Sequence, residues 1–162
     1  MNNLSTEADK FFLQKTVELA EENVRTGKGG PFAAIITKND KIIATGTNVV
    51  TTSHDPTAHA EISAIRKACS ILSDFQLEGC TLYSSCEPCP MCLGAIYWAR
   101  IKRIIFAANK HQAEKAGFDD AFIYKEITLP YPQRNLITQQ MKMPDDDKPF
   151  ELWVESNSKI KY

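Results

Sequence analysis

The sequence predicts an α/β protein, a three-layer α/β/α sandwich with a central mixed sheet of about five strands. Short, apolar, isoleucine-rich runs alternate with longer segments of helical character, which is the pattern of a sheet covered by helices. The order strand–helix–strand over residues 81–107 implies a parallel pair of strands joined by a helix. A chain of 162 residues is expected to form one compact core.

The N-terminal helix is expected to begin at a capping box formed by Thr6 and Asp9. Its apolar residues recur at helical spacing: Leu13, Val17, Ala20 and Val24. The glycine-rich residues 27–31 end this helix. Strands are expected at 32–37 and 41–44, joined by a turn at Lys38-Asn39-Asp40.

The remaining elements follow from the same signals. The polar residues 46–57 form a loop that carries Asn48 and His54. The elements expected after this loop are a helix from His59 to about Ile71, a strand at 81–85, a helix at 89–99, a strand at 103–107, helical turns at 112–115 and 121–125, and a fifth strand at 136–141. Residues 143–149 form a polar linker before an apolar segment at 150–155. The predicted division is a core of residues 1–143 and a C-terminal segment of residues 144–162.

Composition and charge argue against several classes of function. The net charge of −1 offers no basic surface of the kind that nucleic-acid binding needs. No run approaches the ~20 apolar residues of a membrane span, and residues 1–10 lack the apolar stretch of a signal peptide. Five cysteines without a leader indicate a reducing compartment and not a disulfide framework. We therefore expect a cytoplasmic protein that does not bind membranes, and the charge disfavours nucleic acid as its partner.

Cys89 and Cys92 have the spacing of two ligands to one metal ion, because residues three apart on a helix project from nearly the same face. Pro88 and Pro90 suit the first turn of a helix, whose positive end lowers the pKa of nearby thiols. His59, before a second helix, is the expected third ligand. Three protein ligands and an open fourth position are typical of catalytic zinc.

Glu61 distinguishes a catalytic site from a structural one. Two residues apart on a helix, Glu61 and His59 point about 200° apart, so both reach one site only if the helix meets it end-on. Cys86 could complete a closed structural zinc knot, but Glu61 would have no role there. An iron–sulfur site of the bacterial spacing would need a cysteine where Ile96 stands. The sequence thus favours a catalytic zinc site with one Zn²⁺ per chain.

His59-Ala60-Glu61 followed by residues 88–92 matches the H-x-E…P-C-x-x-C pattern of zinc-dependent nucleobase deaminases. The chain resembles the bacterial guanine deaminases of the cytidine-deaminase superfamily, and the resemblance covers nearly its whole length. The further matching segments are residues 29–32, Asn48, residues 117–120, residues 122–126 and Tyr162.

The resemblance implies hydrolytic deamination of guanine to xanthine and ammonia, with a zinc-bound hydroxide attacking C2 of the base. It implies Glu61 as general acid and base and Asp120 as a second proton carrier, although Asp119 and Asp120 also suit a helix N-cap. The substrate-binding residues that it implies are Phe32, Asn48, Ala60, Trp98 and Tyr162. It also implies a homodimer that exchanges its C-terminal segments, so that Tyr162 reaches the purine in the partner's site.

Two other classes of function stay open at this point. One is a deaminase of another base, either cytosine or adenosine in tRNA. The other is a binding module that zinc stabilises and that catalyses nothing. Release of ammonia from guanine, lost on chelation and restored by zinc, separates an enzyme from such a module.

Overall fold

The computed structural model describes residues 6–162. Residues 1–5 lie outside the described residues. The expectation that the chain has no signal peptide depends partly on them. The chain forms two compact units, a main unit that ends at Tyr124 and a second unit at Lys125–Tyr162. Each unit is described by itself below. In the described part of the chain, every helix is too short or too polar to cross a membrane.

The main unit is built on a mixed sheet. Its strands are β1 (Ala33–Lys38), β2 (Lys41–Thr47), β3 (Cys80–Cys86) and β4 (Arg103–Ala108). The spatial order is β2-β1-β3-β4. β1 runs antiparallel to both of its neighbours, whereas β3 and β4 are parallel, as the strand–helix–strand order predicts. β4 lies at an edge of this sheet.

The β1–β2 hairpin turns at Asn39 and Asp40, whose φ angles are 51° and 55°. Positive φ at both central residues is the property of a type I′ turn, which Asn and Asp tolerate better than most residues. Lys38 pairs directly with Lys41 across this two-residue turn. The predicted hairpin is therefore confirmed, and β2 extends three residues beyond the expected end at Ala44.

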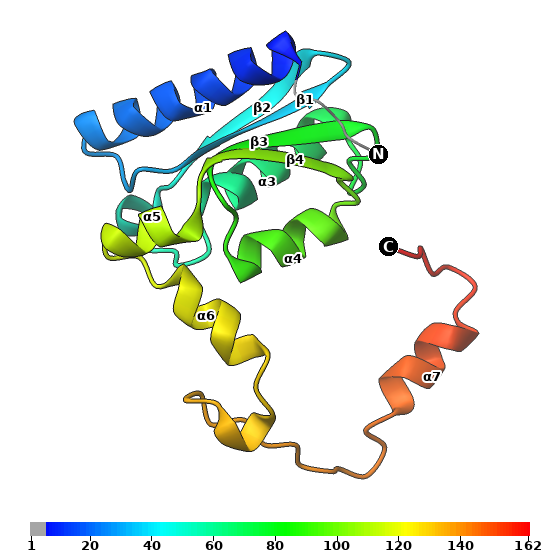
Figure 1. The fold of residues 1–162 in the computed structure, drawn as a ribbon. Helices are drawn as coiled ribbons and strands as arrows, with labels where there is room; N and C mark the ends of the chain where they lie inside the picture. Colours follow the sequence, from blue (N-terminus) through cyan, green and yellow to red (C-terminus); the bar gives the residue numbers. More distant parts are fainter. Residues whose placement is uncertain (1–5) are drawn as a thin grey trace. The chain divides into compact units, whose positions relative to one another are not determined.

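Helices cover both faces of the sheet (Figure 1). α1 (Glu7–Arg25) lies on one face, and α3 (Ala60–Leu72) and α4 (Pro90–Trp98) lie on the other. The alternation of side chains along the strands supplies both cores. Ile35 and Tyr83 pack with Phe12 of α1, whereas their neighbours Ile36 and Leu82 pack with alanines of α3. The predicted three-layer sandwich is confirmed, and short helices complete the main unit: α2 (Val50–Ser53), α5 (Lys110–Lys115) and the first part of α6 (Asp120–Ile127).

A buried ion pair fixes α1 on the sheet. The capping box of Thr6 and Asp9 is present, and the Asp9 carboxylate also accepts two hydrogen bonds of 2.7 Å from Arg103 and one of 2.7 Å from the Tyr83 hydroxyl. The Arg103 guanidinium holds the pKa of Asp9 well below its usual range. The interaction ties the start of α1 to β3 and β4.

The buried side of α1 differs from the stripe of apolar residues noted in the sequence. Its buried residues are Asp9, Phe12, Thr16, Ala20 and Asn23. Val24 is 51% exposed, although it belongs to the apolar series. Polar contacts made by Asp9 at one end and by Asn23 at the other set the rotation of the helix.

The second unit contains a short 3-10 helix at Tyr131–Gln133 and the helix α7 (Lys148–Glu155). The fifth strand expected at 136–141 is wrong for the described residues, and the sheet has four strands. A strand needs a neighbour for its backbone hydrogen bonds, and this segment has none in its own unit. Leu136, Ile137 and Met141 are 77%, 88% and 81% exposed.

Candidate active site

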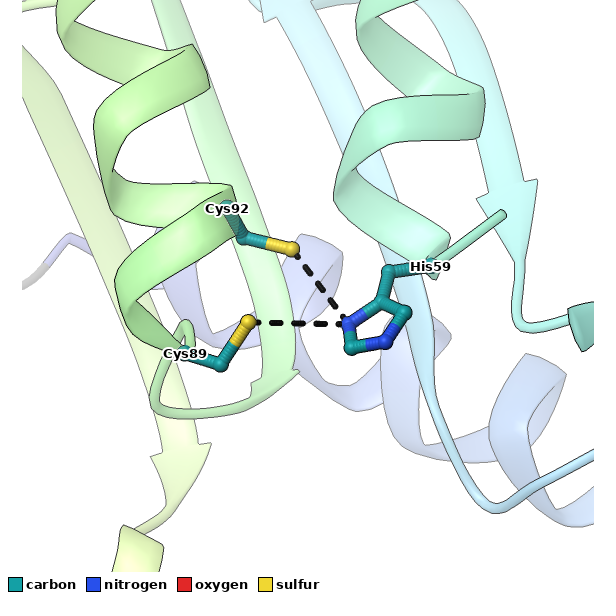
Figure 2. Close-up of side chains that lie close together, drawn as sticks. All are labelled: His59, Cys89 and Cys92. Atoms are coloured by element: carbon teal, nitrogen blue, oxygen red, sulfur yellow. Dashed lines mark hydrogen bonds between the residues drawn. The ribbon is translucent and has the colours of Figure 1, made fainter. Parts of the chain in front are cut away.

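His59, Cys89 and Cys92 form a cluster on the face of the sheet covered by α3 and α4. His59 is the N-cap residue of α3, Cys89 is the N-cap residue of α4, and Cys92 lies in the first turn of α4. Nδ1 of His59 lies 3.6 Å from the sulfur of Cys89 and 3.6 Å from that of Cys92. Figure 2 shows the imidazole and both sulfurs pointing toward one another from the starts of the two helices.

Local sequence explains why these side chains are available. Neither His59 nor Cys89 caps its own helix through its side chain, so both side chains turn toward the space between the helices. Pro90, the first residue of α4, has no backbone N–H and needs no cap at that position. The positive ends of two helix dipoles therefore meet at the cluster, where they favour thiolates.

The geometry of the cluster suits a zinc ion. Zn–S and Zn–N bonds of about 2.3 and 2.0–2.1 Å hold sulfur and nitrogen about 3.5 Å apart at a tetrahedral angle. The three ligand atoms lie within 4.8 Å of one another, and Cys89 and Cys92 are buried. A site with three protein ligands keeps a fourth position for water or substrate.

The thiol of Cys89 ionises more readily than that of Cys92. The pKa of Cys89 is lowered to about 4, first by the hydrogen bond from Cys92 and then by that from His59, against the effect of burial. The pKa of Cys92 is raised, because its thiol donates to Cys89 and is buried. The bond to Cys89 raises the pKa of His59. The cluster thus offers a thiolate that attracts a divalent cation, and it holds protons that the cation would displace.

Glu61 lies beside the cluster, in the first turn of α3. It is 6% exposed, and burial raises the pKa of its carboxyl. One carboxyl oxygen lies 3.3 Å from the Ser84 hydroxyl, and the other lies 3.4 Å from the sulfur of Cys92. Because α3 meets the site with its first turn, His59 and Glu61 both line one cavity. A buried carboxyl with a raised pKa beside a metal site is suited to proton transfer.

A cavity of about 530 Å³ opens onto the cluster. Its walls are formed by residues from the segments beside β1 and β2, from α2, from the starts of α3 and α6 and from the loop that leads into α4. The residues that line it are Gly27, Gly29, Gly30, Phe32, Asn48, Val50, Thr51, His59, Glu61, Glu87, Cys89, Phe118 and Asp120. Burial raises the pKa of the Asp120 carboxyl. The cavity has room for a small planar molecule.

The structure brings six of the predicted site residues into this cavity and places four elsewhere. Those that line it are Phe32, Asn48, His59, Glu61, Cys89 and Asp120. Cys92 contacts His59 but does not itself line the cavity. Ala60 is fully buried and does not line the cavity, and Trp98, the last residue of α4, is 62% exposed. Tyr162 belongs to the second unit.

Several residues at the site were not singled out from the sequence, and Phe118 and Asn23 make the most specific contacts among them. Phe118 lines the cavity, and its ring meets that of Phe32 edge-on at 4.7 Å between centroids. Asn23 of α1 is 3% exposed, and its amide donates hydrogen bonds of 2.8 Å to the backbone oxygens of Gly30 and Asn48. The helical spacing of Thr16, Ala20 and Asn23 was the available signal, because it places a polar amide on a buried stripe.

Comparisons with known proteins agree with this geometry. Residues 6–108 match the sequence profile of the cytidine and deoxycytidylate deaminase zinc-binding region. The chain is 54% identical over 151 residues to guanine deaminase of Bacillus subtilis (strain 168), a match that covers 93% of this chain and 97% of that protein. It is 42% identical over 122 residues to a tRNA-specific adenosine deaminase of Aquifex aeolicus (strain VF5), with 74% and 78% coverage.

The fold is also shared. The X-ray structure of guanine deaminase from Bacillus subtilis matches with a TM-score of 0.92 and 52% identity, covering 100% of this chain and 99% of that one. The profile spans the segments that carry His59, Glu61, Cys89 and Cys92, and it describes a zinc-binding region, so zinc is the cofactor of this cluster. The chain belongs to the zinc-binding family of cytidine and deoxycytidylate deaminases.

Proposed function

We propose that the protein hydrolyses guanine to xanthine and ammonia. The observation that carries this proposal is the similarity to a guanine deaminase over nearly the whole of both chains, including residues beyond the profile that ends at 108. The similarity to a tRNA-specific adenosine deaminase covers less of the chain. The cavity fits a free base, because its walls offer aromatic rings, one amide and carboxyl groups.

The base is held by side chains of the cavity wall. Phe32 and Phe118 supply apolar surface for its faces, and the amide of Asn48 supplies a donor and an acceptor for its edge. Ala60 is included on the strength of the family resemblance, as a backbone N–H at the positive end of α3 that donates to the exocyclic oxygen of the base. We include Trp98 and Tyr162 in this proposal on the strength of the family resemblance.

Glu61 moves the protons of the reaction. It takes one from the attacking water, returns it to a ring nitrogen and helps the amino group on C2 to leave as ammonia. Burial raises the pKa of its carboxyl, so the protonated form that it needs as a proton donor forms more readily than in water. Asp120, also raised in pKa, is the second proton carrier near the leaving group. Zinc, when bound by His59, Cys89 and Cys92, makes water acidic enough to react at neutral pH.

We also propose that the working form is a cytoplasmic homodimer in which residues 144–162 are exchanged between subunits. The second unit exposes apolar side chains of α7, with Phe150 at 70% and Leu152 at 56%. In the main unit, Phe106 of the edge strand β4 is 43% exposed. Surfaces of this kind are covered by partner chains in obligate oligomers.

A panel assay tests the proposed reaction. The zinc-loaded protein is incubated with guanine, adenine, cytosine, their nucleosides, an aminotriazine and a tRNA anticodon stem, and the released ammonia is measured. Guanine is expected to react fastest, and chelation followed by added zinc should abolish and restore the reaction. Fastest release from tRNA adenosine or from cytosine would move the assignment to another base, and no release from any compound would favour a binding module.

A further inference from the structure

We propose that Tyr124 is a positioning residue, whose hydroxyl fixes the helix carrying Asp120 against the loop that carries Cys89. The inference rests on the proposed function, because it assigns a task to Asp120. The Tyr124 hydroxyl donates a hydrogen bond of 2.7 Å to the backbone oxygen of Pro88, the residue directly before Cys89. Tyr124 does not itself line the cavity.

The loop at 87–89 is held by several contacts. The backbone N–H of Glu87 donates to the oxygen of Ala108 at 2.8 Å. The Glu87 carboxylate accepts one hydrogen bond from the backbone N–H and one from the ammonium group of Lys110, both at 3.1 Å. The Lys110 ammonium also lies 5.4 Å from the centroid of the Tyr124 ring. Because these contacts fix the backbone next to Pro88, the Pro88 oxygen is a well-fixed acceptor for the Tyr124 hydroxyl.

Asp120 and Tyr124 lie on the same side of α6. They are four residues apart, so their side chains project from one helix face. Both are half-buried, whereas Asp119, Phe122 and Ile123 between and beside them are exposed. Asp120 lines the cavity, and one turn further along Tyr124 reaches the metal-ligand loop. The Tyr124 hydroxyl therefore connects the helix that carries Asp120 to the residue directly before Cys89, and so fixes the position of Asp120 relative to Cys89.

Removal of this hydroxyl should act through Asp120. A catalytic group displaced by about 1 Å can cost about 100-fold in rate. In Tyr124→Phe the ring and its contact with Lys110 are kept, but the anchor to Pro88 is lost. We expect kcat for guanine to fall by roughly 10-fold or more, with KM changed little and one zinc per chain retained.

Tyr83→Phe is the matched control. Its hydroxyl also makes a hydrogen bond of 2.7 Å, to Asp9, but on the opposite face of the sheet. Tyr83→Phe should lower the midpoint of thermal unfolding at least as much as Tyr124→Phe and leave kcat nearly unchanged. If both variants lower kcat equally, the effect is one of general stability and the proposal is overturned.

Two further measurements separate positioning from mere support. In an Asp120→Asn background, Tyr124→Phe should have little additional effect on kcat, because both changes disable one function. Fully additive losses would contradict the proposal. Amide hydrogen exchange, which does not depend on turnover, should become faster in residues 117–124 of Tyr124→Phe and stay unchanged in α3. Unchanged exchange in 117–124 would overturn the proposal even if the panel assay identifies another substrate or none.

Discussion

Glu61 shows how a single position acquires its chemistry from its surroundings. Its carboxyl is removed from water, lies beside two metal-ligand residues and contacts the Ser84 hydroxyl and the Cys92 sulfur. Burial disfavours its charged form and raises its pKa. A residue that served only to begin α3 would not need this environment, because exposed carboxylates stabilise helix starts equally well.

Glu61→Gln keeps the shape of the side chain and removes its ability to carry protons. We expect kcat to fall by at least ~10²-fold, the lower end of what general acid–base groups contribute. The zinc content, measured by metal analysis, should stay near one per chain because Glu61 is not among the three ligands. Turnover close to that of the unmodified protein would exclude Glu61 as the proton carrier.

Of the three cysteines near the site, Cys89 and Cys92 are metal ligands and Cys86 is not. Cys86 is buried, its thiol lies 3.7 Å from the backbone oxygen of Asn109, and burial raises its pKa to about 11. Replacing His59, Cys89 or Cys92 with Ala should abolish zinc binding and activity and lower thermal stability, because a metal bound only by the folded state stabilises it. Cys86→Ser should retain zinc. Loss of zinc in Cys86→Ser with retention in Cys89→Ala would show that the ligand set is wrong.

At the scale of elements, α1 is oriented by polar contacts at its two ends. Asp9 is buried and bound to Arg103 and Tyr83, and Asn23 reaches the loop that carries Asn48. Apolar contacts are not directional and would allow α1 to turn about its axis at low cost. The hydrogen bonds of Asp9 and Asn23 form in only one orientation of the helix. α1 thereby holds the wall of the cavity that contains Gly30 and Asn48.

The buried ion pair makes stability depend on pH in acid. The pKa of Asp9 is lower in the folded than in the unfolded chain, where it is ~3.9, so its contribution is present above that value and is lost as pH falls further. Asp9→Asn should cost about 3 kcal/mol at pH 7, near the lower limit for buried pairs because the Arg103 side chain is 33% exposed. Denaturant unfolding should show this difference shrinking below pH ~4. A constant difference down to pH 2 would contradict the assignment.

At the scale of the whole molecule, the proposed exchange of C-terminal segments predicts that two chains share each site. Deleting residues 156–162 should sharply reduce kcat/KM for guanine without releasing zinc. A Glu61→Gln chain mixed with a chain lacking Tyr162 should recover part of the activity, because one hybrid site has both residues intact. Assays of each chain alone and of the refolded mixture test this. A mixture as inactive as its parents, or a silent deletion, would show that the segment is not shared.

The sequence by itself determined the features that depend on neighbours along the chain. The thiols of Cys89 and Cys92 share a face because of helical spacing, and the hairpin turns at Asn39 and Asp40 because these residues tolerate positive φ. The strand–helix–strand order of β3, α4 and β4 required a parallel pair. Local geometry suffices for each of these.

Only the tertiary structure decided the features that depend on distant partners. The side of α1 that faces the sheet is set by the hydrogen bonds between Asp9 and Arg103. The position of Phe118 in the cavity wall is set by its contact with Phe32. The bond from Tyr124 to Pro88 joins residues far apart in sequence, and neither residue type signals it. Residues 136–141 have the composition of a strand but form none in their own unit, because a strand exists only where another backbone accepts its hydrogen bonds.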